Sequence, residues 1–276
     1  MNTIDALDNV GLLSLNQYTT RRWSVREAAE GCARAGLRYI GLWRDKVAKT
    51  GLAESARICK DNGLTVSSLC RGGMFPAASE PQRRTNIDDN RRAIEECVEL
   101  GSSTLVLVCG GLAGCAIDDA RRMVREGIAA ILPYASERGV RLGIEPLHPM
   151  FAADRSVISM LGQALDMAEE IDPSRVGVIV DVYHVWWDPD LFAQIERARG
   201  RIYGFHVSDW LVPPPDVLLG RGMMGDGVIE IRRIRAAVQA SGYSGPIECE
   251  IFNRDIWAMP EDEVLALMKQ RYLEHC

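Results

Sequence analysis

Residues 104–145 read TLVLVCGGLAGCAIDDARRMVREGIAAILPYASERGVRLGIE, and this stretch decides the fold. An apolar segment at 104–109 precedes an amphipathic segment at 117–138, and a second apolar segment at 141–145 ends in Glu145. Short apolar segments predict buried strands, and the long amphipathic one predicts a helix that Pro133 is expected to bend. Because the connection is long, two strands joined in this way must pair in parallel.

The same alternation extends in both directions and predicts a barrel. We expect strands at 11–15, 39–43, 64–70, 104–109, 141–145, 176–181, 202–207 and 246–252. We expect helices at 24–35, 51–62, 88–100, 117–138, 156–171, 190–198, 229–241 and 260–275. Eight strands and eight helices in strict alternation predict an α/β fold of the (β/α)₈ TIM-barrel type.

The sequence shows no linker and no second domain, so we expect a single domain over residues 1–276, and local signals mark several of its helix ends. Ser24 and Glu27 form a capping box at the start of the first helix, and Gly63 and Gly101 end two others. An open doubly wound sheet is the alternative, but no glycine-rich phosphate motif follows the first strand. The one long loop, 208–228, is expected to act as a lid.

Composition excludes several classes of function. The net charge of −6 and the pI of about 5.4 disfavour a nucleic-acid partner. The N-terminal residues 1–15 lack a basic region and make a poor signal peptide, and no apolar stretch reaches the roughly 18 residues of a membrane span. The eight cysteines form no CxxC pair, which fits a reducing cytoplasm. We therefore expect a cytoplasmic protein without a membrane partner.

Charged residues stand at the ends of the last four predicted strands. These residues are Glu145, Asp181, His206 and Glu250. Strand ends carry the active site in this fold, and successive strands are neighbours, so these side chains should converge at one side of the barrel mouth. Glu248 competes with Glu250 because alternate residues share a face, but position 250 lies nearer the mouth.

A divalent cation would compensate the cost of burying three carboxylates together. Three oxygen ligands and one imidazole nitrogen suit Mn²⁺, Mg²⁺ or Co²⁺ and also allow Zn²⁺. We expect one divalent metal ion, with Mn²⁺ as the first choice.

These residues carry a resemblance to a known family. The chain resembles the xylose isomerase-like TIM-barrel superfamily, also described as sugar phosphate isomerase/epimerase or AP endonuclease family 2. The resemblance implies that Glu145, Asp181, His206 and Glu250 hold one catalytic metal, and that His184 and Arg221 bind substrate beside it. It also places Arg221 before the Gly225-Asp226-Gly227 turn.

The resemblance implies an enzyme that takes a proton from the carbon next to a carbonyl of a sugar-like substrate, through an enediolate. In the epimerases the two Glu ligands form the acid/base pair, which points to Glu145 and Glu250. The segment Glu145-Pro146-Leu147-His148-Pro149 departs from the ketohexose epimerase pattern and is similar to that of C-glycoside deglycosidases. There His148 is a second candidate base, since an imidazole titrates near neutral pH.

An isomerase or epimerase is the main expectation. A lyase that uses the same enolisation, on a 3-oxo-glycoside or an inosose, is the alternative. An AP endonuclease would need three zinc ions, and the chain has only four histidines. A sugar-binding barrel without catalytic activity is the fourth hypothesis.

Other residues near the strand ends are candidates for contact with substrate. Two groups are involved, the tryptophans and the arginines: Trp43, Trp186, Trp187, Trp210, Arg44 and Arg71. The expected partners are a sugar or glycoside and other copies of this chain, or a small second subunit if the protein is a deglycosidase.

Overall fold

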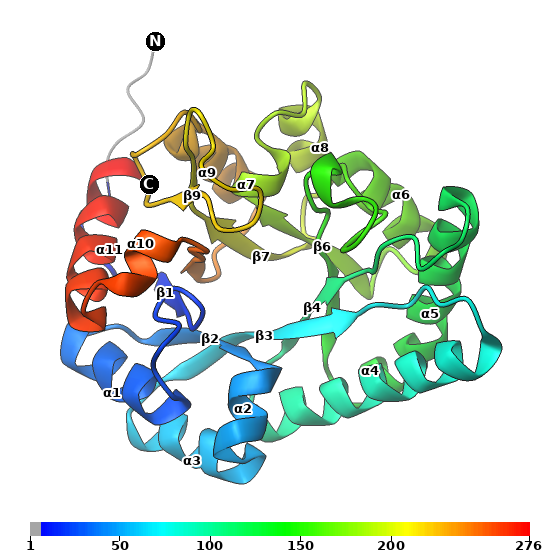
Figure 1. Cartoon of the computed structure of the whole chain (residues 1–276), viewed down its shortest axis with the longest axis horizontal. Coiled ribbons are helices and arrows are strands. Elements are labelled where there is room, and N and C mark those ends of the chain that lie inside the picture. Colours follow the sequence, from blue (N-terminus) through cyan, green and yellow to red (C-terminus); the bar gives the residue numbers. More distant parts are fainter. Residues whose placement is uncertain (1–6) are drawn as a thin grey trace.

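The computed structural model describes residues 7–276, and its central feature is a closed barrel of parallel strands (Figure 1). The strands of the barrel are β1 (Leu13–Asn16), β2 (Tyr39–Trp43), β3 (Thr65–Gly73), β4 (Thr104–Val108), β5 (Arg141–Ile144), β6 (Val176–Asp181), β7 (Ile202–Val207) and β10 (Ile247–Cys249). Neighbouring strands pair in chain order, and β1 closes the ring by pairing with both β2 and β10. The predicted (β/α)₈ barrel is confirmed.

Helices surround the barrel on the outside (Figure 1). The long ones are α1 (Val25–Ala35), α3 (Leu52–Asp61), α4 (Glu80–Leu100), α5 (Ile117–Glu137), α6 (Leu161–Ile171), α8 (Leu191–Arg197), α9 (Ile231–Ala240) and α11 (Glu261–His275). Strands β4 and β6 and the inner faces of these helices are almost fully buried. Helix α11 lies beside α1, where Arg34 pairs with Asp262, so the end of the chain packs next to its beginning.

Helix ends follow the predicted capping signals. Ser24 and Glu27 form the capping box at the start of α1. Gly101 follows α4 with a φ of 69°, a left-handed conformation that glycine adopts at low cost. These signals are local in sequence, which explains why they were predictable.

Two helix starts were predicted wrongly. Helix α4 begins at Glu80 and not near residue 88, because Ser79 caps it and Pro81 lies in the first turn, where a missing N–H costs nothing. Helix α6 begins at Leu161 and not at Ser156, since Ser156 forms a bridge with Gly110. Helix α5 continues through Pro133.

Short elements at the mouth of the barrel were not predicted. They are α2 (Arg44–Thr50), α7 (Val182–Val185), α10 (Arg254–Ala258), the 3₁₀ helix η1 (Pro149–Phe151) and the hairpin β8 (Asp209–Trp210) with β9 (Arg221–Gly222). Each follows a barrel strand at its carboxyl end. The mouth therefore contains short regular elements as well as the irregular segment between β8 and β9.

Two sequence expectations concern membranes and secretion. No helix within residues 7–276 is long and apolar enough to cross a membrane. Residues 1–6, on which the expectation about a signal peptide partly rests, lie outside the described residues.

Candidate metal centre and active site

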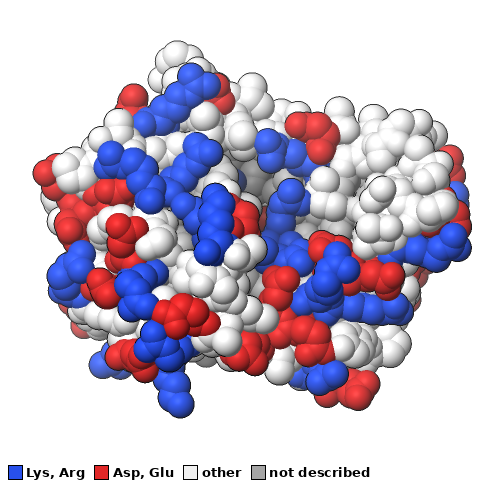
Figure 2. All heavy atoms as spheres, turned by 60° about the horizontal axis from the view of Figure 1, so that its bottom comes forward, with Lys and Arg blue, Asp and Glu red and all other residues white. Residues whose placement is uncertain are grey.

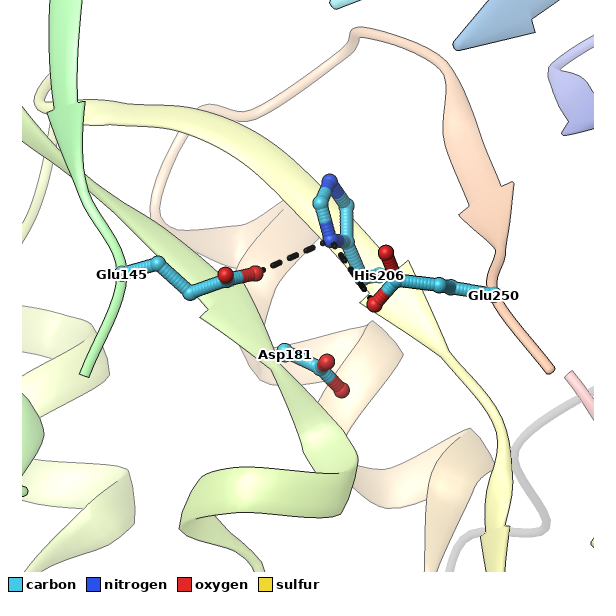
Figure 3. A group of neighbouring side chains, drawn as sticks. All are labelled: Glu145, Asp181, His206 and Glu250. Carbon is cyan, nitrogen blue, oxygen red and sulfur yellow. Dashed lines mark ion pairs between the residues drawn. The ribbon is translucent and has the colours of Figure 1, made fainter. Parts of the chain in front are cut away.

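Three carboxylate side chains and one imidazole side chain meet at the carboxyl end of the barrel (Figure 3). Asp181 ends β6 and His206 lies on β7, while Glu145 and Glu250 directly follow β5 and β10. One ligand atom from each residue lies within 4.8 Å of the others. All four side chains are buried, with Asp181 fully excluded from solvent.

The geometry of this cluster fits a cation. His206 Nδ1 lies 3.2 Å from Glu145 Oε1 and 4.0 Å from Glu250 Oε2 (Figure 3). Within the described chain, Glu145 Oε1 and both ring nitrogens of His206 are buried without a hydrogen-bond partner. Such orphaned atoms are costly unless something binds them. The cluster could therefore hold a metal ion, with Glu145, Asp181, His206 and Glu250 as its ligands.

Arg221 reaches the same cluster from β9. Its Nη1 atom donates to Asp181 Oδ2 at 2.9 Å and to Glu250 Oε2 at 2.8 Å. Its Nη2 atom lies 3.0 Å from Nε2 of His184. Each carboxylate oxygen has two lone pairs, so these bonds leave acceptor capacity on Asp181 and Glu250 for a cation.

Burial and charge shift the pKa values of the cluster. Burial alone would lower the pKa of His206, but Glu248, Glu145 and Glu250 outweigh it and raise that pKa to about 10. Burial raises the pKa of Glu250 to about 8, against the opposing charge of Arg221. Burial lowers the pKa of His184 to about 3, so this ring is neutral. A cation held by the carboxylates would favour their charged forms and lower the pKa of Glu250.

Glu248 lies deeper in the barrel than Glu250. Asn16, Ser67 and Ser68 donate hydrogen bonds to its carboxylate at 2.7–3.2 Å. Its Oε1 is 3.9 Å from His206 Nε2, on the side of the ring opposite to Glu145. The structure thus brings Glu250, and not Glu248, to the candidate ligand group.

A cavity of about 370 Å³ opens over this cluster. Five sequence candidates line it, namely Glu145, Glu250, His184, Arg221 and Arg71, together with the aromatic candidate Trp43. Further lining residues that sequence reasoning missed include Tyr18, Arg21, Phe151, Arg155, Leu218, Leu219, Phe252 and Trp257. A different cavity, of about 390 Å³, lies at the amino-terminal end of the strands, away from the mouth.

Other candidates lie outside the cavity wall. The His148 ring accepts a hydrogen bond from the backbone N–H of Met150 and packs against Trp210, with ring centres 4.9 Å apart. Trp186 also packs on Trp210, at 5.5 Å. Arg44 is held by Asp89 and Glu96 on α4. The structure does not bring these side chains, or Trp187, into the cavity wall.

Asn16, at the end of β1, is a residue that sequence reasoning missed. Its amide nitrogen donates to Glu248 Oε1 at 2.7 Å and to Glu250 Oε1 at 3.0 Å. Its oxygen accepts from the indole of Trp43 at 2.9 Å. Asn16 therefore fixes one candidate ligand and one aromatic wall residue together. Its position at a strand end was the signal that could have identified it.

Asp209 organises the loop that carries Arg221. Its carboxylate accepts hydrogen bonds from the backbone N–H groups of Gly225, Gly227 and Ile229 at 2.9–3.0 Å. Gly225 has a φ of 89°, and a Cβ on Gly227 would lie 2.1 Å from the carbonyl oxygen of Trp210. The glycines are required because the loop wraps tightly around this carboxylate.

Asp209→Ala is expected to lower the free energy of unfolding by about 1–3 kcal/mol, because the buried N–H of Ile229 and the part-buried N–H groups of Gly225 and Gly227 lose their acceptor. Urea denaturation followed by circular dichroism measures this change. The control is Asp226→Ala in the same loop, where an exposed ion pair with Arg271 contributes about 0–1 kcal/mol. Equal losses in the two variants would contradict the role given to Asp209.

Comparisons with known proteins agree with this architecture. The closed parallel barrel makes the chain a TIM-barrel protein, and the buried cluster of three carboxylates and one histidine lies at the mouth of that barrel. The family model described as "Xylose isomerase-like TIM barrel" matches residues 29–273, and the chain belongs to this family. The expected resemblance is confirmed.

Three similar proteins help to place the chain within the family. The crystal structure of protein SMc04130 from Sinorhizobium meliloti 1021 is 52% identical, with a TM-score of 0.95, over 97% of this chain and 99% of that one. A 3-dehydroshikimate dehydratase from Pseudomonas putida is 27% identical over 91% of this chain, which spans 40% of the length of that relative. The L-ribulose-5-phosphate 3-epimerase UlaE of Escherichia coli K12 is 25% identical over 70% of this chain and 66% of its own.

Proposed function

We propose that this protein is a divalent-metal-dependent enzyme that takes a proton from the carbon next to a carbonyl of a sugar-like substrate. The observation that carries the proposal is the buried meeting of Glu145, Asp181, His206 and Glu250 beneath a cavity of about 370 Å³. Relatives within the family bear the names of a dehydratase and an epimerase, and both reactions are consistent with a first step of this kind.

The ligand set suits the metal that the proposal requires. When bound, a divalent cation would stabilise negative charge that develops on the carbonyl oxygen of the substrate. Carboxylate and imidazole ligands favour Mn²⁺, with Mg²⁺, Co²⁺ and Zn²⁺ as alternatives. The remaining steps belong to side chains of this chain.

Proton transfer is assigned to Glu250 and Glu145, which lie on opposite sides of His206 Nδ1 (Figure 3). One carboxylate accepts the proton from the α-carbon, and the electron pair of the C–H bond moves toward the carbonyl. In an epimerase or isomerase, the other carboxylate returns a proton to carbon. Arg221, held against Asp181 and Glu250, donates a hydrogen bond to a substrate oxygen, and the neutral His184 ring keeps its guanidinium in place.

A lyase is the second candidate, favoured by the match to the dehydratase over 91% of this chain. There the same first step is followed by cleavage of the C–O bond at the neighbouring carbon, and the leaving oxygen takes a proton from one of the two carboxylates and departs as water or as an alcohol. The substrate cavity, the cluster and Arg221 serve both outcomes equally.

Metal-loaded protein in D₂O is expected to introduce deuterium at the α-carbon of its substrate, and metal-free protein is not. Mass spectrometry on ketoses, ketose phosphates, inososes, 3-oxo-glycosides and 3-dehydroshikimate measures this exchange with Mn²⁺, Mg²⁺, Co²⁺ or Zn²⁺ added. An unchanged product mass, apart from deuterium, identifies an isomerase, and loss of water or an aglycone identifies a lyase. Equal exchange in the presence and absence of added metal, after chelation, would contradict the proposal.

A further inference from the structure

Three arginines line the cavity above the cluster without close carboxylate partners. In the described part of the chain, no carboxylate lies within 4 Å of the guanidinium groups of Arg21 and Arg71. Arg155 has only the exposed Asp154, at 3.8 Å, beyond the length of a hydrogen bond. Arg21 lies over the ring of Trp257 at 4.5 Å. These side chains leave their donors available to the cavity.

Arg44 shows the contrast on the same side of the barrel. Arg44 directly follows β2, and Arg71 lies on the neighbouring strand β3. The guanidinium of Arg44, however, makes paired hydrogen bonds to Asp89 and Glu96. A partly buried guanidinium without such a partner is unfavourable. The fold satisfies Arg44 and leaves Arg71 unsatisfied, although the two residues line a common pocket.

The charged groups near Arg71 make its lack of a carboxylate partner more unfavourable. Burial lowers the pKa of Arg71, and the nearby positive charges of Arg155 and Arg44 lower it further. Arg71 and Arg155 are therefore close enough to repel each other. Figure 2 shows a face on which basic side chains gather around a hollow.

The acidic residues of the cavity do not compensate these charges. Within residues 7–276, Glu145 and Glu250 are the only carboxylates that line it, and both belong to the candidate metal centre. Arg221 is already paired with Asp181 and Glu250. A cation in the centre would add positive charge below the arginines. The cavity is thus arranged for a ligand that brings its own negative charge.

We propose that the substrate carries an anionic group, a carboxylate or a phosphate, which Arg71 and Arg155 bind while its carbonyl end reaches the metal centre. Guanidinium groups bind both anions through paired hydrogen bonds, which explains the shared chemistry. The aromatic side chains of Trp43, Phe252 and Trp257 line the same cavity and give it an apolar wall. The placement of the substrate carbonyl at the metal centre rests on the proposed function, and the binding of an anion by Arg71 and Arg155 does not.

The first experiment tests the arginines without the metal. Calorimetric titration of metal-free protein with inorganic phosphate is expected to show binding that Arg71→Gln and Arg155→Gln each weaken about tenfold or more, as loss of a charged hydrogen bond requires. The control Arg84→Gln removes an exposed arginine on α4 and is expected to leave the affinity unchanged. Equal phosphate affinity in all four proteins would overturn the proposal.

The second experiment compares matched sugars on Mn²⁺-loaded protein. D-fructose 6-phosphate is tested against D-fructose, and 5-keto-D-gluconate against L-sorbose. At least one charged member is expected to bind about tenfold tighter than its neutral partner, and Arg71→Gln removes the difference. The pair that shows the preference distinguishes phosphate from carboxylate. Neutral members that bind as tightly as the charged ones would overturn the inference.

The two proposals fail in different ways. Phosphate binding that depends on Arg71, in a protein that takes up none of Mn²⁺, Mg²⁺, Co²⁺ and Zn²⁺, would defeat the proposed function and support the anion site. Metal uptake with α-proton exchange that is as fast on the neutral sugars as on their charged partners, and that Arg71→Gln leaves unchanged for both, would support the proposed function and defeat the anion site.

Discussion

Replacing Asp181 with Asn is expected to remove the bound metal and to lower turnover by at least about a thousandfold, the equivalent of several kcal/mol of transition-state stabilisation. Asp181 is the least exposed member of the cluster, with no accessible surface. Its Oδ1 atom accepts the backbone N–H of Tyr183, and its Oδ2 atom accepts Nη1 of Arg221. The change therefore affects a side chain that cannot move to solvent.

The side-chain amide of the Asp181→Asn variant would fit this site in neither orientation. If its oxygen keeps the bond to Tyr183 N–H, its amino group faces the guanidinium of Arg221 and the cation. If it flips, the amino group meets the N–H of Tyr183. In both cases one negative charge is lost from a buried group that must hold a divalent ion, so the affinity for the metal falls.

Elemental analysis of metal-loaded and dialysed protein, together with α-proton exchange, measures the result. The matched control is Asp190→Asn, the same change at an exposed position just before α8, which is expected to retain metal and turnover. Thermal unfolding followed by circular dichroism shows that both variants are folded. If the folded Asp181→Asn protein kept one metal per chain and full exchange, the proposed centre would be wrong.

The barrel itself could be predicted because its signals are local. Several strands are short apolar segments, such as Thr104–Val108, and long helices such as Ile117–Glu137 bury one apolar face. The cluster could be predicted as well, because a charged residue at the end of an apolar strand is unusual and the parallel order brings neighbouring strand ends together. Glu145, Asp181, His206 and Glu250 meet for that reason.

The wall of the cavity could not be predicted because its residues come from turns whose path depends on tertiary packing. Arg155 lies in the segment after η1, and Leu218 and Leu219 lie between β8 and β9. His148 was a candidate base because it lies three residues after Glu145 in the sequence. The chain turns into η1 at Pro149, the His148 ring caps that turn, and the side chain does not line the cavity, so its role as a base stays a prediction.

Glu250→Gln is expected to lower turnover by about 10²- to 10⁴-fold while the protein keeps its fold, because Gln retains an oxygen for the cation but cannot carry the transferred proton. Glu145→Gln is expected to give a loss of similar size, since the two carboxylates share the proton transfer. α-Proton exchange under single-turnover conditions separates this loss from changes in product release.

Glu248→Gln is the sharpest control, because it makes the same change two residues earlier, on the strand β10 that Glu250 directly follows. Glu248 accepts from Asn16, Ser67 and Ser68 inside the barrel and does not line the cavity above the cluster. Its loss acts on the reaction only through Asn16 and His206, so we expect an effect at least about tenfold smaller than that of Glu250→Gln, as is usual for residues that orient a ligand. A larger loss at Glu248 than at Glu250, with metal content equal in both variants, would move the proton-transfer role to the residue deeper in the barrel.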